Sequence, residues 1–162
     1  MIFVTVGTQL AFPRLIDAMQ AWAEEQAAGE RVVAQTGEAA AGRWPHLEVH
    51  ARMMPADFAR HIAEARVIVA HAGIGTVLSA RAAGRPLILV PRRADLGEHR
   101  NDHQQATVHQ LTGRSGIYVV EAPEAIAGHL TTALAPPDAD AAAPERDRLI
   151  RHLAGVLRAP VS

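Results

Sequence analysis

The stretch that decides the fold is VIVAHAGIGTVLSARAAGRPLILVPRRADLGEHRNDHQQ, which runs from Val67 to Gln105. A short apolar run, Val67–Ala70, stops at a glycine-rich turn, and a second run, Leu87–Val90, follows a helix-like segment. A polar loop then leads to the start of another helix at about Asn101. This order of strand, glycine turn, helix and strand predicts a nucleotide site at the carboxyl edge of a parallel sheet.

Apolar runs alternate with amphipathic segments outside this stretch as well. The predicted strands are Ile2–Val6, Arg31–Gln35, Leu47–Ala51, Val67–Ala70, Leu87–Val90 and Ile117–Val120. The predicted helices are Pro13–Ala28, Pro55–Ala65, Thr76–Ala83, Asn101–Leu111, Pro123–Ala135 and Glu145–Leu157. Alternation of strands with helices predicts an α/β fold, a single Rossmann-like domain with about six parallel strands and helices on both faces.

The length of 162 residues is enough for one domain that buries a hydrophobic core without staples. Residues 1–135 form the predicted Rossmann-like domain, and residues 136–144, PPDADAAAP, form a linker of small residues. Residues 145–162 are expected to form an amphipathic helix and a tail. The apolar stripe of that helix is suited to packing on the sheet of its own chain.

Composition excludes several classes of protein. There is no cysteine, so disulfides and thiolate metal sites are excluded, and a reducing compartment fits. Sixteen basic against 17 acidic residues leave no basic stripe for nucleic acid, and 4% aromatic residues give no platform for base stacking. No apolar run approaches the roughly 20 residues that span a bilayer, and no basic region precedes the first strand. We therefore expect a soluble cytoplasmic protein with no nucleic-acid partner.

Two glycine turns follow predicted strands, Gly7-Thr8-Gln9 and Gly73-Ile74-Gly75-Thr76. Glycine at such a place can serve geometry alone, because it permits a tight turn from strand to helix. The functional alternative is that amides at the following helix N-terminus bind phosphate, with Thr8 and Thr76 adding hydroxyl groups. Both turns would open on the same sheet edge, which favours a phosphate site. The pattern is neither a P-loop nor a GxGxxG fingerprint.

A polar cluster occupies Glu98 to Gln105. His99 and His103 are four residues apart, a spacing that metal sites use, but no third ligand stands at a recognisable spacing and no metal is predicted. A solvated helix start with Asn101 or Asp102 as N-cap is the plain interpretation. The functional one is that Asp102, Gln104 and Gln105 present hydrogen-bonding groups to sugar hydroxyls.

Together these clusters resemble the C-terminal, donor-binding domain of glycosyltransferase family 28, which includes the MurG N-acetylglucosaminyltransferase and two-chain enzymes of dolichol-linked and exopolysaccharide synthesis. The resemblance runs from Met1 to about Leu134 and rests on FVTVGTQ, HAGIGT, AAGRPLILVPR and EHRNDHQQ. Within the family, the chain resembles most the PssE type of small subunit, in which the donor half of a GT-B enzyme is a separate polypeptide.

The resemblance implies roles for individual residues. It places Gly7 and Thr8 in the first turn facing the diphosphate, and His71, Gly73, Gly75 and Thr76 in the second. Gln9, next in the first turn, is a further candidate for binding the donor. The resemblance brings Asp102, His103, Gln104 and Gln105 to the sugar and ribose, and His99 of the same polar cluster is a further candidate for binding the donor. Enzymes of the MurG type carry an acidic residue where this chain has Ser79, so ribose binding is expected to depend on Glu98 or another group.

The reaction implied is transfer from a UDP-sugar to a lipid-linked saccharide acceptor. Helix dipoles and amides would offset charge on the leaving UDP, so no metal or cofactor is expected. The catalytic base is expected on a membrane-anchored, PssD-like partner, which would hold this chain at the inner face of the membrane. By the same resemblance, the C-terminal helix can pack on that partner instead of its own sheet. A nucleotide-sugar binding or regulatory module without turnover is the alternative.

Arg92 and Arg93 follow the Leu87–Val90 strand at the same predicted edge. A solvated pair in a loop is the plain interpretation, because most arginines are exposed. The functional interpretation is bidentate capture of a carboxylate, which would select UDP-glucuronate over neutral UDP-sugars.

Overall fold

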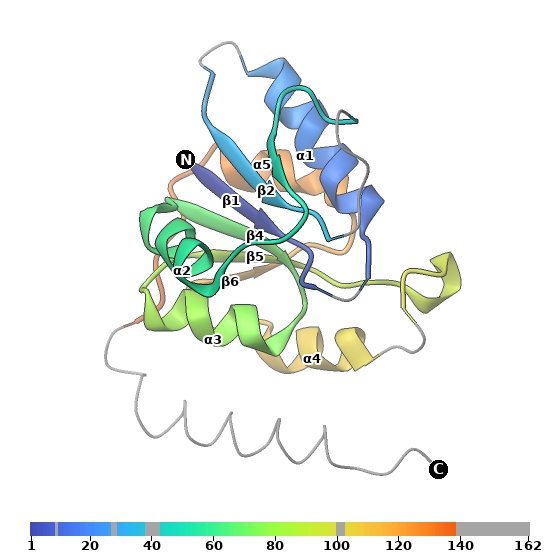
Figure 1. Cartoon of the computed structure of the whole chain (residues 1–162). Coiled ribbons are helices and arrows are strands. Elements are labelled where there is room, and N and C mark those ends of the chain that lie inside the picture. The colour runs from blue at the N-terminus through green and yellow to red at the C-terminus, as the bar shows by residue number, and fades with distance from the viewer. Residues whose placement is uncertain (9, 27–28, 38–42, 100–102, 139–162) are drawn as a thin grey trace.

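The computed structural model describes residues 1–8, 10–26, 29–37, 43–99 and 103–138. Six strands form one sheet in the order β3-β2-β1-β4-β5-β6, and every neighbouring pair is parallel (Figure 1). The strands are β1 Ile2–Thr5, β2 Val32–Gln35, β3 Glu48–His50, β4 Val67–His71, β5 Leu87–Val90 and β6 Ile117–Val119. The predicted α/β class and six-stranded parallel sheet are confirmed.

Helices cover both faces of this sheet, as buried parallel strands require (Figure 1). The α-helices are α1 Pro13–Glu25, α2 Pro55–Glu64, α3 Ile74–Ala82, α4 His103–Leu111 and α5 Ile126–Leu130, and two short 3-10 helices are η1 Ala94–Leu96 and η2 Pro123–Ala125. Pro13 and Pro55 stand in the first turns of their helices, where a missing N–H costs nothing.

Alternation along β1 shows how the two cores are divided. Ile2 and Val4 belong to the cluster that contains the apolar face of α1 and residues of α5. Phe3 points to the opposite face, into the cluster formed with α2, α3 and α4. Because successive side chains of a strand face opposite ways, an unbroken apolar run is needed to fill both cores.

The predicted helix Pro123–Ala135 is wrong in its C-terminal part, because α5 ends at Leu130. The hydroxyls of Thr131 and Thr132 donate to main-chain carbonyls of the last turn, at 2.9 and 3.1 Å. The chain then passes beside β6, where the Ala135 amide donates to the Tyr118 hydroxyl at 2.9 Å. Four-residue spacing of apolar side chains therefore overestimated the length of this helix.

Other boundaries differ by a few residues, and α1 ends at Glu25 rather than at Ala28. Residues 139–162 lie outside the described residues, so most of the predicted linker and the predicted C-terminal helix stay predictions. Within the described part of the chain, no helix is both long and apolar enough to cross a membrane.

Phe3 offers a test of the core on the α2 side. It is fully buried and its ring lies 5.4 Å from that of Phe58 and 5.6 Å from that of His61. We expect Phe3→Ala to lower the free energy of unfolding by about 3–5 kcal/mol, because the cavity cannot fully collapse. Urea denaturation measures this. Met54→Ala is the control: its side chain is 70% exposed, and a comparable loss there would contradict the assignment.

Candidate functional site

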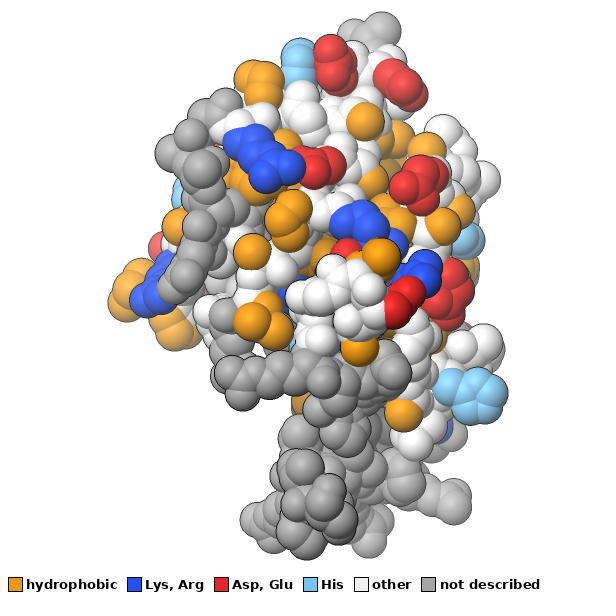
Figure 2. Space-filling view, turned by 90° about the vertical axis from the view of Figure 1, so that its right-hand side faces the viewer, with side chains coloured by type: hydrophobic (Ala, Val, Ile, Leu, Met, Phe, Trp, Pro, Cys, Tyr) orange, Lys and Arg blue, Asp and Glu red, His pale blue; other side chains and the backbone are white. Residues whose placement is uncertain are grey.

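The two glycine turns meet at the point where the order of the sheet changes direction. β1 and β4 are neighbours in register, Thr5 beside Ala70, and the helices that follow them, α1 and α3, lie on opposite faces. A crevice therefore opens between the carboxyl ends of these strands, the usual ligand site of such sheets. Figure 2 views the side of the molecule toward which the strands run, where hydrophobic side chains lie among basic and acidic ones.

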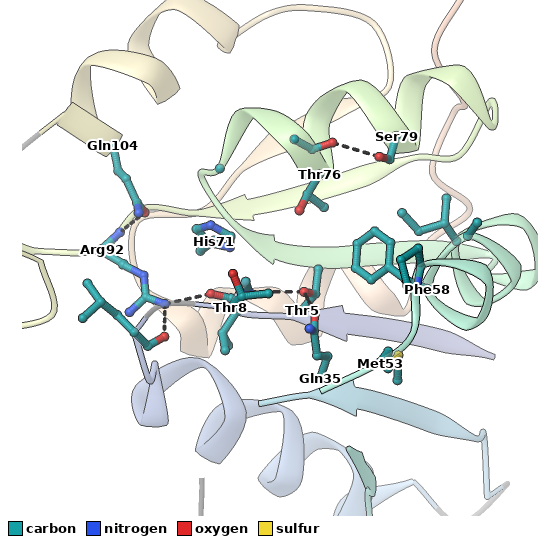
Figure 3. Close-up of a pocket in the computed structure, with 18 of the residues that line it drawn as sticks. Thr5, Thr8, Gln35, Met53, Phe58, His71, Thr76, Ser79, Arg92 and Gln104 are labelled. Carbon is teal, nitrogen blue, oxygen red and sulfur yellow. Dashed lines mark hydrogen bonds between the residues drawn. The ribbon is translucent and has the colours of Figure 1, made fainter. Parts of the chain in front are cut away.

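A cavity of about 890 Å³ occupies this crevice and continues between α2 and α3. Predicted site residues that line it are Gly7, Thr8, His71, Gly73, Gly75, Thr76, Arg92, His99 and Gln104. Its other end is apolar, lined by Met53, Pro55, Phe58, Ala59 and Ile62. Figure 3 shows His71 in the middle, with Met53 and Phe58 on the side away from Arg92 and Gln104.

The remaining predicted residues are placed differently. Gln9 and Asp102 lie outside the described residues, and so does the side chain of His103, which begins α4. Gln105 is half-buried on α4, and Arg93 and Glu98 belong to the loop after β5. None of Gln105, Arg93 and Glu98 is among the residues that line the described cavity.

His71 joins the two turns by packing against a glycine of each. A Cβ atom on Gly7 would lie 2.8 Å from Cε1 of the imidazole, and one on Gly73 would overlap Nε2. Gly7 also has a φ of +78°, in the left-handed region. A Cβ on Gly75, in contrast, would meet nothing within 4 Å. Two of the predicted glycines are thus required by the ring of His71, and the third borders open space.

The His71 imidazole is neutral at pH 7. Burial lowers its pKa to about 4, with the charges of Arg92 and His99 acting in the same direction and the Thr5 backbone opposing them. Its Nδ1 atom is buried and has no hydrogen-bond partner in the described part of the chain. A neutral imidazole has one donor and one acceptor, so its other nitrogen, Nε2, is the atom that can hydrogen-bond a ligand in the cavity that His71 lines.

This pKa makes stability depend on pH. Between pH 6.5 and about 4, His71 is protonated in the unfolded chain but neutral in the folded chain. The free energy of unfolding therefore falls as the pH falls through that window. We expect His71 to account for up to about 3 kcal/mol of this loss.

The measurement is urea denaturation of the wild type and of His71→Asn at pH 7, 6, 5 and 4. The variant should show a flatter dependence, since it has no titrating group at position 71. His61, whose pKa burial also lowers, is present in both proteins and cancels. Parallel profiles for the two proteins would rule out a buried neutral His71.

A pair of buried polar side chains, Thr5 and Gln35, supports the first turn. They are register partners at the ends of β1 and β2, and the Thr5 hydroxyl donates to Oε1 of Gln35 at 2.7 Å. The same hydroxyl accepts a hydrogen bond from the Gly7 amide at 3.3 Å. Our sequence interpretation missed this pair. Its signal was a polar residue closing each of two otherwise apolar runs.

The helix α3 begins at the cavity without a side-chain cap. Gly73 occupies the N-cap position, and no acidic side chain lies in the first turn. The positive end of the helix dipole therefore faces the cavity unopposed by a carboxylate of its own first turn, next to the His71 ring. Ser79 lines the cavity and donates its hydroxyl hydrogen to the Gly75 carbonyl of the same helix, at 2.9 Å.

Arg92, though not Arg93, departs from both interpretations of the arginine pair. Its side chain is 2% exposed, so it is not solvated, and its Nη atoms donate to main-chain carbonyls of Val6, Leu10, Ala11 and Glu98. A guanidinium whose forked donors are already bound cannot capture a carboxylate in bidentate fashion. Arg93 is exposed and pairs with Asp95.

The carboxylate of Glu98 is also bound by groups of the protein itself. The expected contact of Glu98 with ribose is corrected accordingly. Nε and Nη2 of Arg14 donate to its two carboxylate oxygens at 2.6 and 2.9 Å, and the Arg93 amide donates to one of them at 2.9 Å. Burial alone would raise the pKa of Glu98, but the hydrogen bonds from Arg14 and the Arg93 amide hold it below its usual value.

Gln104 is buried on α4 and lines the cavity. Its Oε1 accepts a hydrogen bond from the Arg92 amide at 3.0 Å, which fixes the orientation of the side chain. The NH2 group is then the part of Gln104 best placed to serve a ligand, as a donor. Among the residues that the structure describes, no three His, Cys, Asp or Glu side chains gather as a metal site would require.

Comparison with known proteins identifies the family of this domain. The chain belongs to the glycosyltransferase family 28 C-terminal domain, whose model matches residues 1–152, and it is therefore a donor-binding domain of that family. No curated protein matches the chain in sequence.

Solved glycosyltransferases share the fold. CalG4, the calicheamicin glycosyltransferase, has a TM-score of 0.60 at 22% identity, covering 96% of this chain and 37% of its own. The glycosyltransferase of kitacinnamycin has 0.59 at 21% identity, covering 81% and 34%. MurG of Acinetobacter baumannii has 0.57 at 20% identity, covering 80% and 40%. The chain thus spans well under half the length of these enzymes.

Proposed function

We propose that this domain binds a UDP-sugar and forms the donor half of a glycosyltransferase that acts on a lipid-linked saccharide in exopolysaccharide synthesis. The observation that carries the proposal is the meeting of two glycine turns over the neutral ring of His71, at the mouth of a cavity with an apolar end. A nucleotide sugar has matching parts: a charged diphosphate, an apolar base face and a polyhydroxylated sugar.

The diphosphate fits between the two turns. The amides at the start of α3 and the positive end of its dipole suit an anion, and a neutral His71 can add one hydrogen bond. Thr8 and Thr76 bring hydroxyls to the same part of the cavity. Family membership and the open space beside Gly75 both support this placement.

The base then lies in the apolar end of the cavity, between α2 and α3, against Met53 and Phe58. Burial of the base there would stabilise the complex without a charged partner. The sugar would extend the other way, toward His99 and Gln104, where the Gln104 NH2 group can donate to a sugar oxygen.

In the proposed reaction the acceptor hydroxyl attacks the anomeric carbon, and the bond from that carbon to the UDP oxygen breaks. Negative charge grows on the diphosphate as it leaves, and preorganised amides and the α3 dipole stabilise that charge. This stabilisation asks for no metal ion. A base that takes the proton of the acceptor hydroxyl is expected on the acceptor half.

The acceptor half would be a membrane-anchored partner of the PssD type. The similar enzymes are more than twice as long as the matched region, which supports a second half facing the cavity. Such a partner would hold this domain at the inner face of the membrane.

The alternative is a nucleotide-sugar binding module without turnover. Co-expression of this chain with the product of a neighbouring reading frame that encodes an anchored acceptor half distinguishes the binding module from the two-component enzyme. Sugar transfer by the pair, and by neither chain alone, would support the two-component enzyme.

Gly75→Ala tests the site directly. Alanine is the better helix former by about 1 kcal/mol, so the variant should be at least as stable as the wild type. We expect its affinity for UDP to fall about 10-fold or more, because the added methyl enters the space proposed for phosphate. Calorimetric titration with UDP measures this.

Gly128→Ala is the matched control, since Gly128 is likewise a glycine of a helix whose Cβ would meet nothing within 4 Å. It should leave UDP binding unchanged. A wild-type chain that binds neither UDP nor a UDP-sugar, alone or with its partner, would defeat the proposed function.

Glucuronate is the sugar that we favour, with Arg93 as the ligand of its carboxylate. Arg93 is exposed on the loop after β5, and its surface pairing with Asp95 is of the kind that contributes little energy and can be exchanged for a substrate. We expect Arg93→Ala to weaken UDP-glucuronate binding several-fold and to leave UDP-glucose unchanged. Calorimetry with both donors decides: equal losses would remove glucuronate selection by Arg93.

A further inference from the structure

A single buried cation ties down the turn between β1 and α1. The guanidinium of Arg92 donates to the carbonyls of Ala11 at 2.5 Å, Leu10 at 2.6 Å and Val6 at 2.9 Å. A fourth bond, at 3.3 Å, goes to the carbonyl of Glu98 in its own loop. Three of the four carbonyls thus belong to residues that directly follow β1, some 80 residues earlier in the chain.

Phe12 completes the enclosure of this cation. The Cζ atom of Arg92 lies 4.7 Å from the centre of the Phe12 ring, and the ring itself is 1% exposed. A cation over an aromatic face is attracted to it, more strongly when water is excluded. Burial lowers the pKa of Arg92 to about 10, so the group is still charged at neutral pH.

A second arginine makes the reciprocal connection. Arg14, in the first turn of α1, reaches from the segment after β1 to the loop after β5, where it binds Glu98 and the Pro91 carbonyl. Arg92 reaches from the loop after β5 back to the segment after β1. The two loops that border the cavity are therefore joined twice, in opposite directions.

The direction of these bonds decides which way the turn faces. In a trans peptide the N–H points away from the C=O. When Arg92 holds the Val6 carbonyl, the Gly7 amide of the same peptide points the other way, and there it meets the Thr5 hydroxyl at 3.3 Å. Arg92 and Thr5 thus hold the two ends of the peptide that begins the first glycine turn.

From this geometry we infer that Arg92 is a positioning residue: by binding Val6, Leu10 and Ala11 it holds the first glycine turn in the form that receives the diphosphate, and it does so without binding the sugar. The inference rests on the proposed function and names what keeps that site in shape. The inference also accounts for the buried cation beside the turn. The positive charge of Arg92 favours an anion in the cavity, and the same charge lowers the pKa of His71.

Arg92→Lys is the test variant. Lysine keeps the charge, but one ammonium with three donors cannot reach four carbonyls in the arrangement that the fork allows. We expect faster amide hydrogen exchange across residues 6–12 of the unliganded chain and no change in β4. We also expect affinity for UDP to fall about 10-fold, the size of loss that weakened bonds to a charged group produce, and by one common factor for UDP-glucose and UDP-glucuronate.

Arg66→Lys is the matched control. Arg66 also uses its fork, binding Glu30 and the Leu130 carbonyl, but it precedes β4 at the opposite edge of the sheet. The control should leave both UDP affinity and exchange in residues 6–12 unchanged. Phe12→Leu is a second test variant, which removes the ring and leaves the carbonyls. It should produce a smaller effect in the same direction, and it serves if Arg92→Lys fails to fold.

The outcomes separate the possibilities. A much larger loss for UDP-glucuronate than for UDP-glucose would mean that Arg92 touches the sugar, and the inference would be wrong. Faster exchange with unchanged UDP affinity in both test variants would also overturn it. If the wild type binds no UDP compound, the proposed function fails by itself, while exchange in residues 6–12 still reports whether Arg92 holds the turn.

Discussion

The imidazole of His71 lies between two glycines, and the arrangement of the site depends on that close approach. One glycine follows the end of β1 and the other follows the end of its neighbour β4, so a single ring lies between two turns that are 66 positions apart in the sequence. Any side chain at either glycine would have to occupy the volume of the ring. With His71 in this position, a side chain at Gly7 or Gly73 would displace the ring, which is why the crevice has glycine in both turns.

The groups around the His71 ring favour negative charge in the cavity. A buried guanidinium, the positive end of a helix and a neutral imidazole surround the same space, while the nearest acidic group on the loop after β5, Glu98, is neutralised by Arg14. An anion in the cavity would thus meet positive potential and little repulsion. Because these groups are preset by the fold, they need not reorganise when an anion binds.

The fold was predictable from sequence where local pattern determines it. Short apolar runs rich in β-branched residues, such as Val67–Ala70, favour a strand buried on both faces, and glycine after such a run marks the edge of the sheet. The role of Arg92 was not predictable, because it depends on carbonyls of a loop far away in sequence, and carbonyls are the same in every residue. Glu98 was misjudged for a similar reason, since its partner Arg14 lies 84 positions before it. A contact between a side chain and backbone groups does not depend on the residue types that carry those groups, so the sequence does not reveal it.

The two borders of the sheet show how this domain avoids joining its sheet to another. At one border, β3 has only three residues, and its Glu48 carries Arg31 and His50 as charged or polar neighbours. At the other, the segment that follows α5 lies against β6 through Ser115 and Tyr118. Short, charged or covered borders prevent strand addition and the aggregation that follows from it. A chain that binds this domain would accordingly be recognised by side chains and surface shape rather than by pairing of strands.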